Sequence, residues 1–109
     1  MVKQGTIIEV NFNPQLGHEQ AGYRPAVVVS NEVFNEKTKL VLVCPITSNV
    51  KSFPLHVILD SSTRTKGAIL CEHVRALDIY SRGFKVIEQL PKDVLEQVLD
   101  IIHSELEIL

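Results

Sequence analysis

The sequence of 109 residues has no tryptophan, only two cysteines and few aromatic residues, which make up 6% of the chain. Two cysteines cannot build a disulfide framework, and no segment reads as a secretory signal, so we expect a reduced, cytoplasmic protein. Every apolar run is shorter than the ~18–20 residues that a membrane-spanning helix needs. The share of hydrophobic residues, 45%, excludes a disordered chain. We expect one soluble domain spanning residues 1–109.

Local metal-ligand and phosphate-binding motifs are also missing. Neither a His-x-x-x-His nor a Cys-x-x-Cys spacing occurs, and no glycine-rich loop joins a predicted strand to a helix. We therefore expect no metal and no cofactor, although ligands brought together from distant segments stay an alternative. The cysteines lie in apolar stretches, which favours a role as small core residues over a role as nucleophiles. The residues concerned are His18, His56, His73, His103, Cys44 and Cys71.

Charge is distributed unevenly along the chain. Residues 1–85 contain ten Lys or Arg and seven Asp or Glu, whereas residues 86–109 contain one lysine and six acidic residues. A mildly basic body with an acidic tail is compatible with a nucleic-acid-binding face on the body. Solvated charge without a function would give the same pattern, so charge alone does not decide.

Five segments have the composition of short β-strands. β-Branched and alternating apolar residues predict them, and they are Ile8–Phe12, Ala26–Val29, Leu40–Cys44, Leu55–Leu59 and Gly67–Val74. Proline lacks an amide hydrogen, so we expect Pro25 to open the second strand and Pro45 to end the third. Residues 33–35 are predicted to form a short turn.

The last part of the chain has a different period. Pro91 is a suitable first residue of a helix, and apolar residues from Val94 to Leu106 recur at spacings of three and four. We predict one amphipathic helix of about four turns. Short strands followed by one helix indicate a mainly β fold, in which a strongly bent antiparallel sheet or small barrel carries the helix.

Two polar segments could carry chemistry. The segment GHEQAGYRP, residues 17–25, places His18, Glu19, Gln20 and Arg24 between glycines that allow a close approach to a ligand. A solvated loop in which Arg24 pairs with Glu19 would have the same composition. The segment PITSN, residues 45–49, could equally be turn chemistry, in which hydroxyl groups satisfy the local backbone.

Together these segments resemble a known family. The run GTIIEVNFNP from Gly5, the run GHEQAGYRPAVVVSN from Gly17, PITS from Pro45 and GAILCEHVRALD from Gly67 are similar to the MazF/PemK toxin endoribonucleases. The resemblance extends over nearly the whole chain, including the final helix. It implies a small SH3-like antiparallel barrel of the CcdB/PemK type, with about five strands and a C-terminal α-helix.

The resemblance implies the toxin of a type II toxin–antitoxin system, which cleaves single-stranded messenger RNA at short sequences without a metal. The ribose 2′-hydroxyl attacks the neighbouring phosphate and leaves a 2′,3′-cyclic phosphate and a 5′-hydroxyl. For this reaction the protein must remove the proton of the 2′-hydroxyl, neutralise the charge of the transition state and help the leaving oxygen depart.

By the same resemblance, Arg24 of Gly-x-Arg-Pro and Thr47 of Pro-x-Thr-Ser are expected to be catalytic. Arg24 would neutralise phosphate oxygens and Thr47 would donate a hydrogen bond to the scissile phosphate. Glu19 and His18 are expected to act as base or to orient Arg24.

Four further residues are expected to contact the substrate: Gln20, Ser48, Phe53 and Glu72. Some PemK-like members have an arginine two residues before an acid in the fifth strand. Here the corresponding pair is Leu70 and Glu72, so a mechanism in which that arginine donates a proton is not available to this chain.

The expected partners are single-stranded RNA, a second copy of the chain and a MazE/PemI-like antitoxin whose acidic, disordered tail blocks the RNA groove. Two alternatives stay open. A CcdB-like toxin would share the barrel and bind gyrase without catalysis, but those toxins carry a tryptophan near the C-terminus, which this chain lacks. An inactive RNA-binding module is the second alternative.

Overall fold

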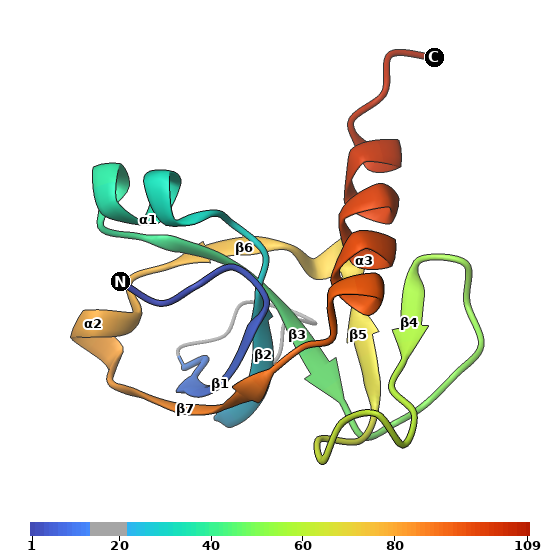
Figure 1. The fold of residues 1–109 in the computed structure, drawn as a ribbon, viewed down its shortest axis with the longest axis horizontal. Helices are drawn as coiled ribbons and strands as arrows, with labels where there is room; N and C mark the ends of the chain where they lie inside the picture. Colours follow the sequence, from blue (N-terminus) through green and yellow to red (C-terminus); the bar gives the residue numbers. More distant parts are fainter. Residues whose placement is uncertain (14–21) are drawn as a thin grey trace.

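The structure is a computed structural model that describes residues 1–13 and 22–109 (Figure 1). Within those ranges the elements follow in the order β1 (Thr6–Asn11), β2 (Tyr23–Val28), α1 (Glu32–Thr38), β3 (Val41–Thr47), β4 (His56–Ile58), β5 (Ala68–Leu70), the 3-10 turn η1 (Cys71–His73), β6 (Arg75–Leu77), α2 (Ile79–Arg82), β7 (Phe84–Gln89) and α3 (Lys92–Glu105).

All strand pairs in the described part of the chain are antiparallel, and they form one bent sheet in the order β4-β5-β3-β2-β1-β7, with β6 paired to β3. The mainly β fold with a C-terminal helix is therefore confirmed. The expected strand number was too low, since the described residues form seven strands. Among them, no ladder joins β4 to β7, so the sheet is not closed into a complete barrel.

The sheet carries a hydrophobic core on each face. One core contains Ile7, Val27, Ile46 and Ile69 and is covered by α3. The other contains Ile8, Val10, Phe12, Ala26, Val28 and Val43. The alternating pattern of residues 8–12 predicted a strand buried on one face only, but Ile7 and Ile8 are neighbours on β1 and both are fully buried. The first strand is covered on both sides because the sheet bends around it.

The predicted C-terminal helix is α3, and its 14 residues correspond to about four turns. Pro91 is its N-cap, one residue earlier than the first helical position. The helix α3 packs against η1 and β4 (Figure 1), and its apolar stripe includes Val94, Leu95 and the fully buried Val98. Across residues 1–13 and 22–109, no helix is long and apolar enough to cross a membrane.

Both proline predictions were wrong. Pro25 is the third residue of β2 rather than its first, and β3 continues through Pro45 to Thr47. Pro45 pairs with Ala26 on one side. On its other side it falls between the residues that pair with β6, 41–43, and those that pair with β5, 46–47. The missing amide hydrogen of Pro45 is tolerated because neither β5 nor β6 pairs with that residue.

Several elements were missed or misread from sequence. Residues 32–38 form the helix α1 rather than a short turn, because the Asn31 side chain accepts the N–H of Phe34 and caps it. The predicted strand 67–74 is divided into β5 and η1. No strand was expected at β7, whose burial lacks a clear period of two and whose register with β1 shifts between Ile7 and Ile8.

Hydrogen bonds of the Glu88 and Arg64 side chains form a clamp that connects β7 to the segment between β4 and β5. The carboxylate of Glu88 on β7 accepts the backbone N–H groups of Arg64 and Thr65 and the Thr65 hydroxyl, at 3.2, 2.7 and 2.7 Å. The Arg64 guanidinium donates to the carbonyl of Ile87 at 3.0 Å. The β4–β5 connection is therefore fixed to β7.

Candidate functional site

Arg24 and Thr47 lie on neighbouring strands, β2 and β3. The last pair in the ladder is Ala26 with Pro45, and Arg24 and Thr47 each lie two residues beyond that pair at the same end of the ladder. Residues two apart on a strand share a face, so both side chains belong to the face that carries Ala26. Neighbouring strands are ~5 Å apart. A guanidinium and a hydroxyl placed this way can bind the same phosphate group.

Both side chains lie at the solvent boundary of the core. Arg24 is exposed and Thr47 is half-buried, whereas Val10, which pairs with Arg24 from β1, is fully buried. The rigid core therefore holds the backbone of Arg24 and leaves the guanidinium in reach of a ligand.

The hydroxyl of Thr47 is oriented by its own backbone. Thr47 Oγ1 accepts the N–H of Asn49 at 3.1 Å, so its hydrogen is directed elsewhere and can be donated. Thr47 also pairs with Ala68 of β5. Gly67, which precedes Ala68, has a φ of 128°, and a Cβ at Gly67 would overlap the carbonyl oxygen of Thr47. Glycine at this position lets β5 pack closely against Thr47.

The base of the segment before β2 is tied together by hydrogen bonds. The N–H of Phe12 donates to the Gly22 carbonyl at 2.8 Å, and the N–H of Gly22 donates to Asn13 Oδ1 at 2.9 Å. From α2, Arg82 donates to the carbonyls of Asn11 and Asn13 at 2.8 and 2.7 Å. Sequence reasoning missed Arg82. These bonds fix Gly22, which lies directly before β2 and two residues before Arg24.

A second guanidinium belongs to the same sheet face. Arg75 on β6 pairs with Val43, and its Cζ lies 5.7 Å from the centre of the Phe12 ring. Arg75 was not predicted as a site residue, because its approach to Phe12 depends on how β6 crosses the sheet. It adds positive charge to the face on which Arg24 lies.

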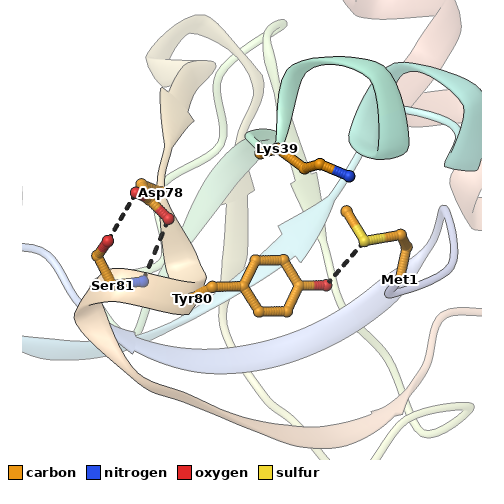
Figure 2. A pocket seen from close by; sticks show the side chains of 5 residues that line it. All are labelled: Met1, Lys39, Asp78, Tyr80 and Ser81. Carbon is orange, nitrogen blue, oxygen red and sulfur yellow. Dashed lines mark hydrogen bonds between the residues drawn. The ribbon is translucent and has the colours of Figure 1, made fainter.

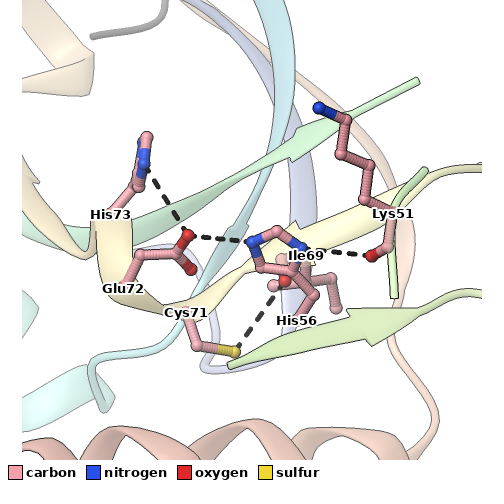
Figure 3. A network of polar contacts seen from close by, with 6 residues as sticks. All are labelled: Lys51, His56, Ile69, Cys71, Glu72 and His73. Atoms are coloured by element: carbon pink, nitrogen blue, oxygen red, sulfur yellow. Dashed lines mark hydrogen bonds and ion pairs between the residues drawn. The ribbon is translucent and has the colours of Figure 1, made fainter. Parts of the chain in front are cut away.

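Glu72 lies in η1 at the centre of a polar network (Figure 3). Its Oε2 is 2.8 Å from His56 Nε2 and 3.9 Å from His73 Nε2. His56 Nδ1 is 3.3 Å from the carbonyl oxygen of Lys51. We call these four residues the Glu72 network. His56 was not predicted as a site residue, and no local sequence motif indicates its contact with Glu72.

The negative charge of Glu72 reaches the C-terminal helix. The pKa of Glu105 on α3 is raised, first because part of its carboxyl is desolvated and second because Glu72 repels its charge. The Glu72 carboxylate and the end of α3 are therefore close enough to interact electrostatically.

Ser48 and Phe53 belong to the segment that connects β3 to β4. Ser48 is exposed and follows Thr47 directly. Phe53 is 49% exposed, and its ring centre lies 5.0 Å from that of His56 at a tilt of 58°. The structure thus brings both Phe53 and Glu72 into contact with His56. Of the other predicted site residues, His18, Glu19 and Gln20 lie outside the described residues.

The two cysteines occupy the core, as predicted. Cys44 and Cys71 are free and fully buried in the core under α3. A hydrogen bond with Cys71, together with burial, raises the pKa of the Cys44 thiol, so it stays protonated and unreactive. Over residues 1–13 and 22–109, no three His, Cys, Asp or Glu side chains gather as a metal site would require.

A separate hollow of about 460 Å³ lies beside α2 (Figure 2). Tyr80 spans it, and its hydroxyl lies 3.6 Å from the sulfur of Met1. The Asp78 carboxylate accepts the N–H and hydroxyl of Ser81, which lowers the pKa of Asp78. Lys39 completes the lining. The Asp78 carboxylate is used to cap α2.

Comparison with known proteins gives consistent results. Residues 3–106 match the model of the PemK-like, MazF-like toxin of type II toxin–antitoxin systems. The endoribonuclease PemK of Escherichia coli is 35% identical over 102 residues, which cover 90% of this chain and 77% of PemK. The crystal structure of MazF from Deinococcus radiodurans has a TM-score of 0.90 at 38% identity, covering 98% of this chain and 97% of that one.

A MazE–MazF complex from the same organism matches with a TM-score of 0.84 at 39% identity, over 96% of this chain and 95% of that one. Sequence and fold therefore agree over nearly the whole length. The chain belongs to the PemK-like, MazF-like toxin family of type II toxin–antitoxin systems.

Proposed function

We propose that this toxin is an endoribonuclease that cleaves single-stranded messenger RNA without a metal ion, using the substrate's own 2′-hydroxyl as nucleophile. The products are a 2′,3′-cyclic phosphate and a 5′-hydroxyl. The observation that carries the proposal is that Arg24 and Thr47 lie on neighbouring strands and on one sheet face, each two residues beyond the last β2–β3 pair, in a family whose relatives include the endoribonucleases PemK and MazF. The proposed place of action is the cytoplasm.

Arg24 is the proposed transition-state stabiliser. Attack of the 2′-oxygen adds negative charge to the two non-bridging phosphate oxygens, and a guanidinium can donate to both at once. Because Arg24 is exposed, it can meet an RNA strand that follows the surface. Its charge is permanent, so this stabilisation does not depend on pH.

Thr47 is the proposed second donor. Its Oγ1 already accepts a hydrogen bond from Asn49, so its own hydrogen is available to the scissile phosphate. Ser48 and Phe53 follow along the same connection, where a hydroxyl can bind a sugar or phosphate and an exposed ring can stack on a base. Gln20 and Glu72 are proposed as further substrate contacts, and His18 or Glu19 as the base or its partner.

The proposed partners follow from the family. Solved relatives include MazE–MazF complexes, so we propose a MazE/PemI-like antitoxin as the inhibitor of this toxin. Two guanidinium groups on one sheet face, Arg24 and Arg75, suit an acidic antitoxin tail as well as they suit RNA. A homodimer with RNA along the interface is proposed as the active form.

The test is to incubate the purified protein with a long single-stranded RNA in excess chelator and to analyse the fragment ends. We expect discrete cuts, a cyclic phosphate upstream and a 5′-hydroxyl downstream, with the target sequence read by primer extension. An intact RNA would contradict the proposal and favour either an inactive RNA-binding module or a CcdB-like toxin. Cuts that require added metal would contradict the mechanism.

A further inference from the structure

The His56 ring is held between two hydrogen-bond acceptors. Nε2 lies 2.8 Å from the carboxylate of Glu72, and Nδ1 lies 3.3 Å from the backbone carbonyl oxygen of Lys51. The His56 side chain is only 13% exposed, so water has limited access to the two nitrogens. Figure 3 shows the ring between Glu72 and Lys51.

Two acceptors require two protons on the ring. A carbonyl oxygen can only accept, and a neutral imidazole has a single N–H. Both bonds therefore form together when His56 is an imidazolium facing an ionised Glu72. If the ring loses its second proton, one of the two bonds is lost.

The groups that face this ring come from three elements besides its own strand, β4. From η1 come Glu72 and His73, which lies 3.9 Å from the Glu72 carboxylate. From α3 comes Glu105, which is close enough to Glu72 for the two carboxylates to repel each other. From the β3–β4 connection come the Lys51 carbonyl and the Phe53 ring.

His56 also faces the proposed RNA site. It pairs with Leu70, and the β4–β5 and β3–β5 registers place residues 56, 70 and 47 on the same sheet face. The segment that His56 fixes through Lys51 begins at Ser48, directly after Thr47, and includes Phe53. His56 therefore connects the Glu72 carboxylate to the connection that carries two proposed substrate contacts.

We propose that His56, in its doubly protonated form, is a positioning residue for RNA binding: it holds Glu72 and the connection from Ser48 to Phe53 in the arrangement that receives the RNA strand. This inference rests on the proposed function. Since imidazole gains and loses its second proton in the neutral range, RNA affinity should fall as pH rises. Loss of the proton removes one tether and one positive charge, and both changes disfavour a polyanion. The chemical step at Arg24 and Thr47 should be unaffected.

The test measures kcat and KM for RNA cleavage from pH 6 to 9, together with the Kd of a 2′-O-methyl oligonucleotide of the mapped target sequence, which cannot be cleaved. For the wild type we expect KM and Kd to rise by roughly threefold to tenfold across this range, a size typical of one lost hydrogen bond. The ratio of kcat between the wild type and the His56→Gln variant described below should stay constant with pH.

The key variant is His56→Gln, which keeps an N–H donor but has no proton to lose in this range. Its KM and Kd should be higher than those of the wild type at pH 6 and change little with pH. His73→Gln is the matched control, because His73 faces the same carboxylate from 3.9 Å and is more exposed; it should keep the wild-type pH profile. A wild-type pH profile of Kd in His56→Gln would overturn the inference.

A second measurement needs no variant. Nitrogen NMR of the histidine rings in the wild-type protein reports whether each ring nitrogen carries a proton. We expect both nitrogens of His56 to be protonated at the pH of tightest RNA binding, and one to lose its proton as Kd rises. A singly protonated His56 at the pH of tightest binding would overturn the inference even if the variant fails to fold. A wild-type protein that binds a long single-stranded RNA but does not cut it would contradict the proposed function alone.

Discussion

Two regions on one face of the sheet are held in place by different forces. Arg24 and Thr47 are placed by strand register, since β2 and β3 pair through buried residues such as Ala26. The Glu72 network is placed by side-chain bonds through the His56 ring. Backbone register does not depend on protonation, whereas a bond to imidazole does. The two proposals together therefore predict that the chemical step depends on backbone register and that RNA binding depends on protonation.

The strongest way to break the first region is Arg24→Ala. It should lower kcat by about a thousandfold or more, because the variant loses the charged donor on the phosphate oxygens. Stability should change by no more than ~1 kcal/mol, since Arg24 is exposed. Single-turnover cleavage and urea unfolding measure the two effects.

Arg24→Lys is the matched control, because it keeps the charge and loses the planar pair of donors. Its rate should lie between those of Arg24→Ala and the wild type. A wild-type rate in Arg24→Ala would remove Arg24 from the mechanism.

Thr47→Val tests the second donor with almost no change in side-chain shape. We expect cleavage to slow by roughly tenfold to a thousandfold, the range for one lost transition-state hydrogen bond. Thr47→Ser keeps the hydroxyl and should stay within about threefold of the wild type. An unchanged single-turnover rate in Thr47→Val would contradict its role.

Gly67→Ala tests whether close packing of β5 positions Thr47. The new Cβ would overlap the Thr47 carbonyl, and the φ of 128° is itself unfavourable for alanine. We expect kcat to fall by about tenfold as Thr47 is displaced, with a loss of stability of ~1–3 kcal/mol.

The matched control is Gly83→Ala, where φ is 79° but nothing lies within 4 Å of the added Cβ. That variant should lose stability without losing kcat. Equal effects on kcat in the two variants would show that backbone strain, and not contact with Thr47, is responsible.

The difference between the two regions also explains what sequence could predict. Runs of β-branched and other apolar residues, such as Ala26–Val29 and Leu40–Cys44, predicted strands because consecutive apolar residues indicate a buried segment. Arg24 and Thr47 could be proposed as catalytic because the family motifs that they match are contiguous in sequence, and their roles stay a prediction. Pro45 was misread, since its tolerance depends on which strands pair beside it.

The contacts that His56 and Arg82 make could not be predicted because their partners are distant in sequence. His56 meets Glu72 across 16 residues, and Arg82 reaches Asn11 across 71. No periodicity or spacing encodes such pairs, because they depend on how the sheet bends. The β7 strand was missed for a related reason, since its residues lack an alternating pattern and its pairing with β1 is irregular.

The smallest expected effect concerns the clamp between Glu88 and the segment that connects β4 to β5. Glu88 accepts hydrogen bonds from Arg64 and Thr65, first of all from the Thr65 hydroxyl, and these lower its pKa. A carboxyl whose pKa is lower in the folded state stabilises the protein at any pH above the pKa it has in the unfolded state. That contribution is lost as the pH falls through the pKa of the folded state. Glu88→Gln should therefore cost ~1 kcal/mol at pH 7.

Because a protonated Glu88 resembles glutamine, the difference between wild type and Glu88→Gln should shrink as pH is lowered towards 3. Urea unfolding at pH 7, 5 and 3 measures it, with Glu36→Gln on the exposed surface of α1 as the control that should change little at any pH. The kcat of Glu88→Gln should equal that of the wild type, since register and not this clamp places Arg24 and Thr47. A difference in stability that is constant with pH would mean that the charge of Glu88 contributes nothing to the clamp.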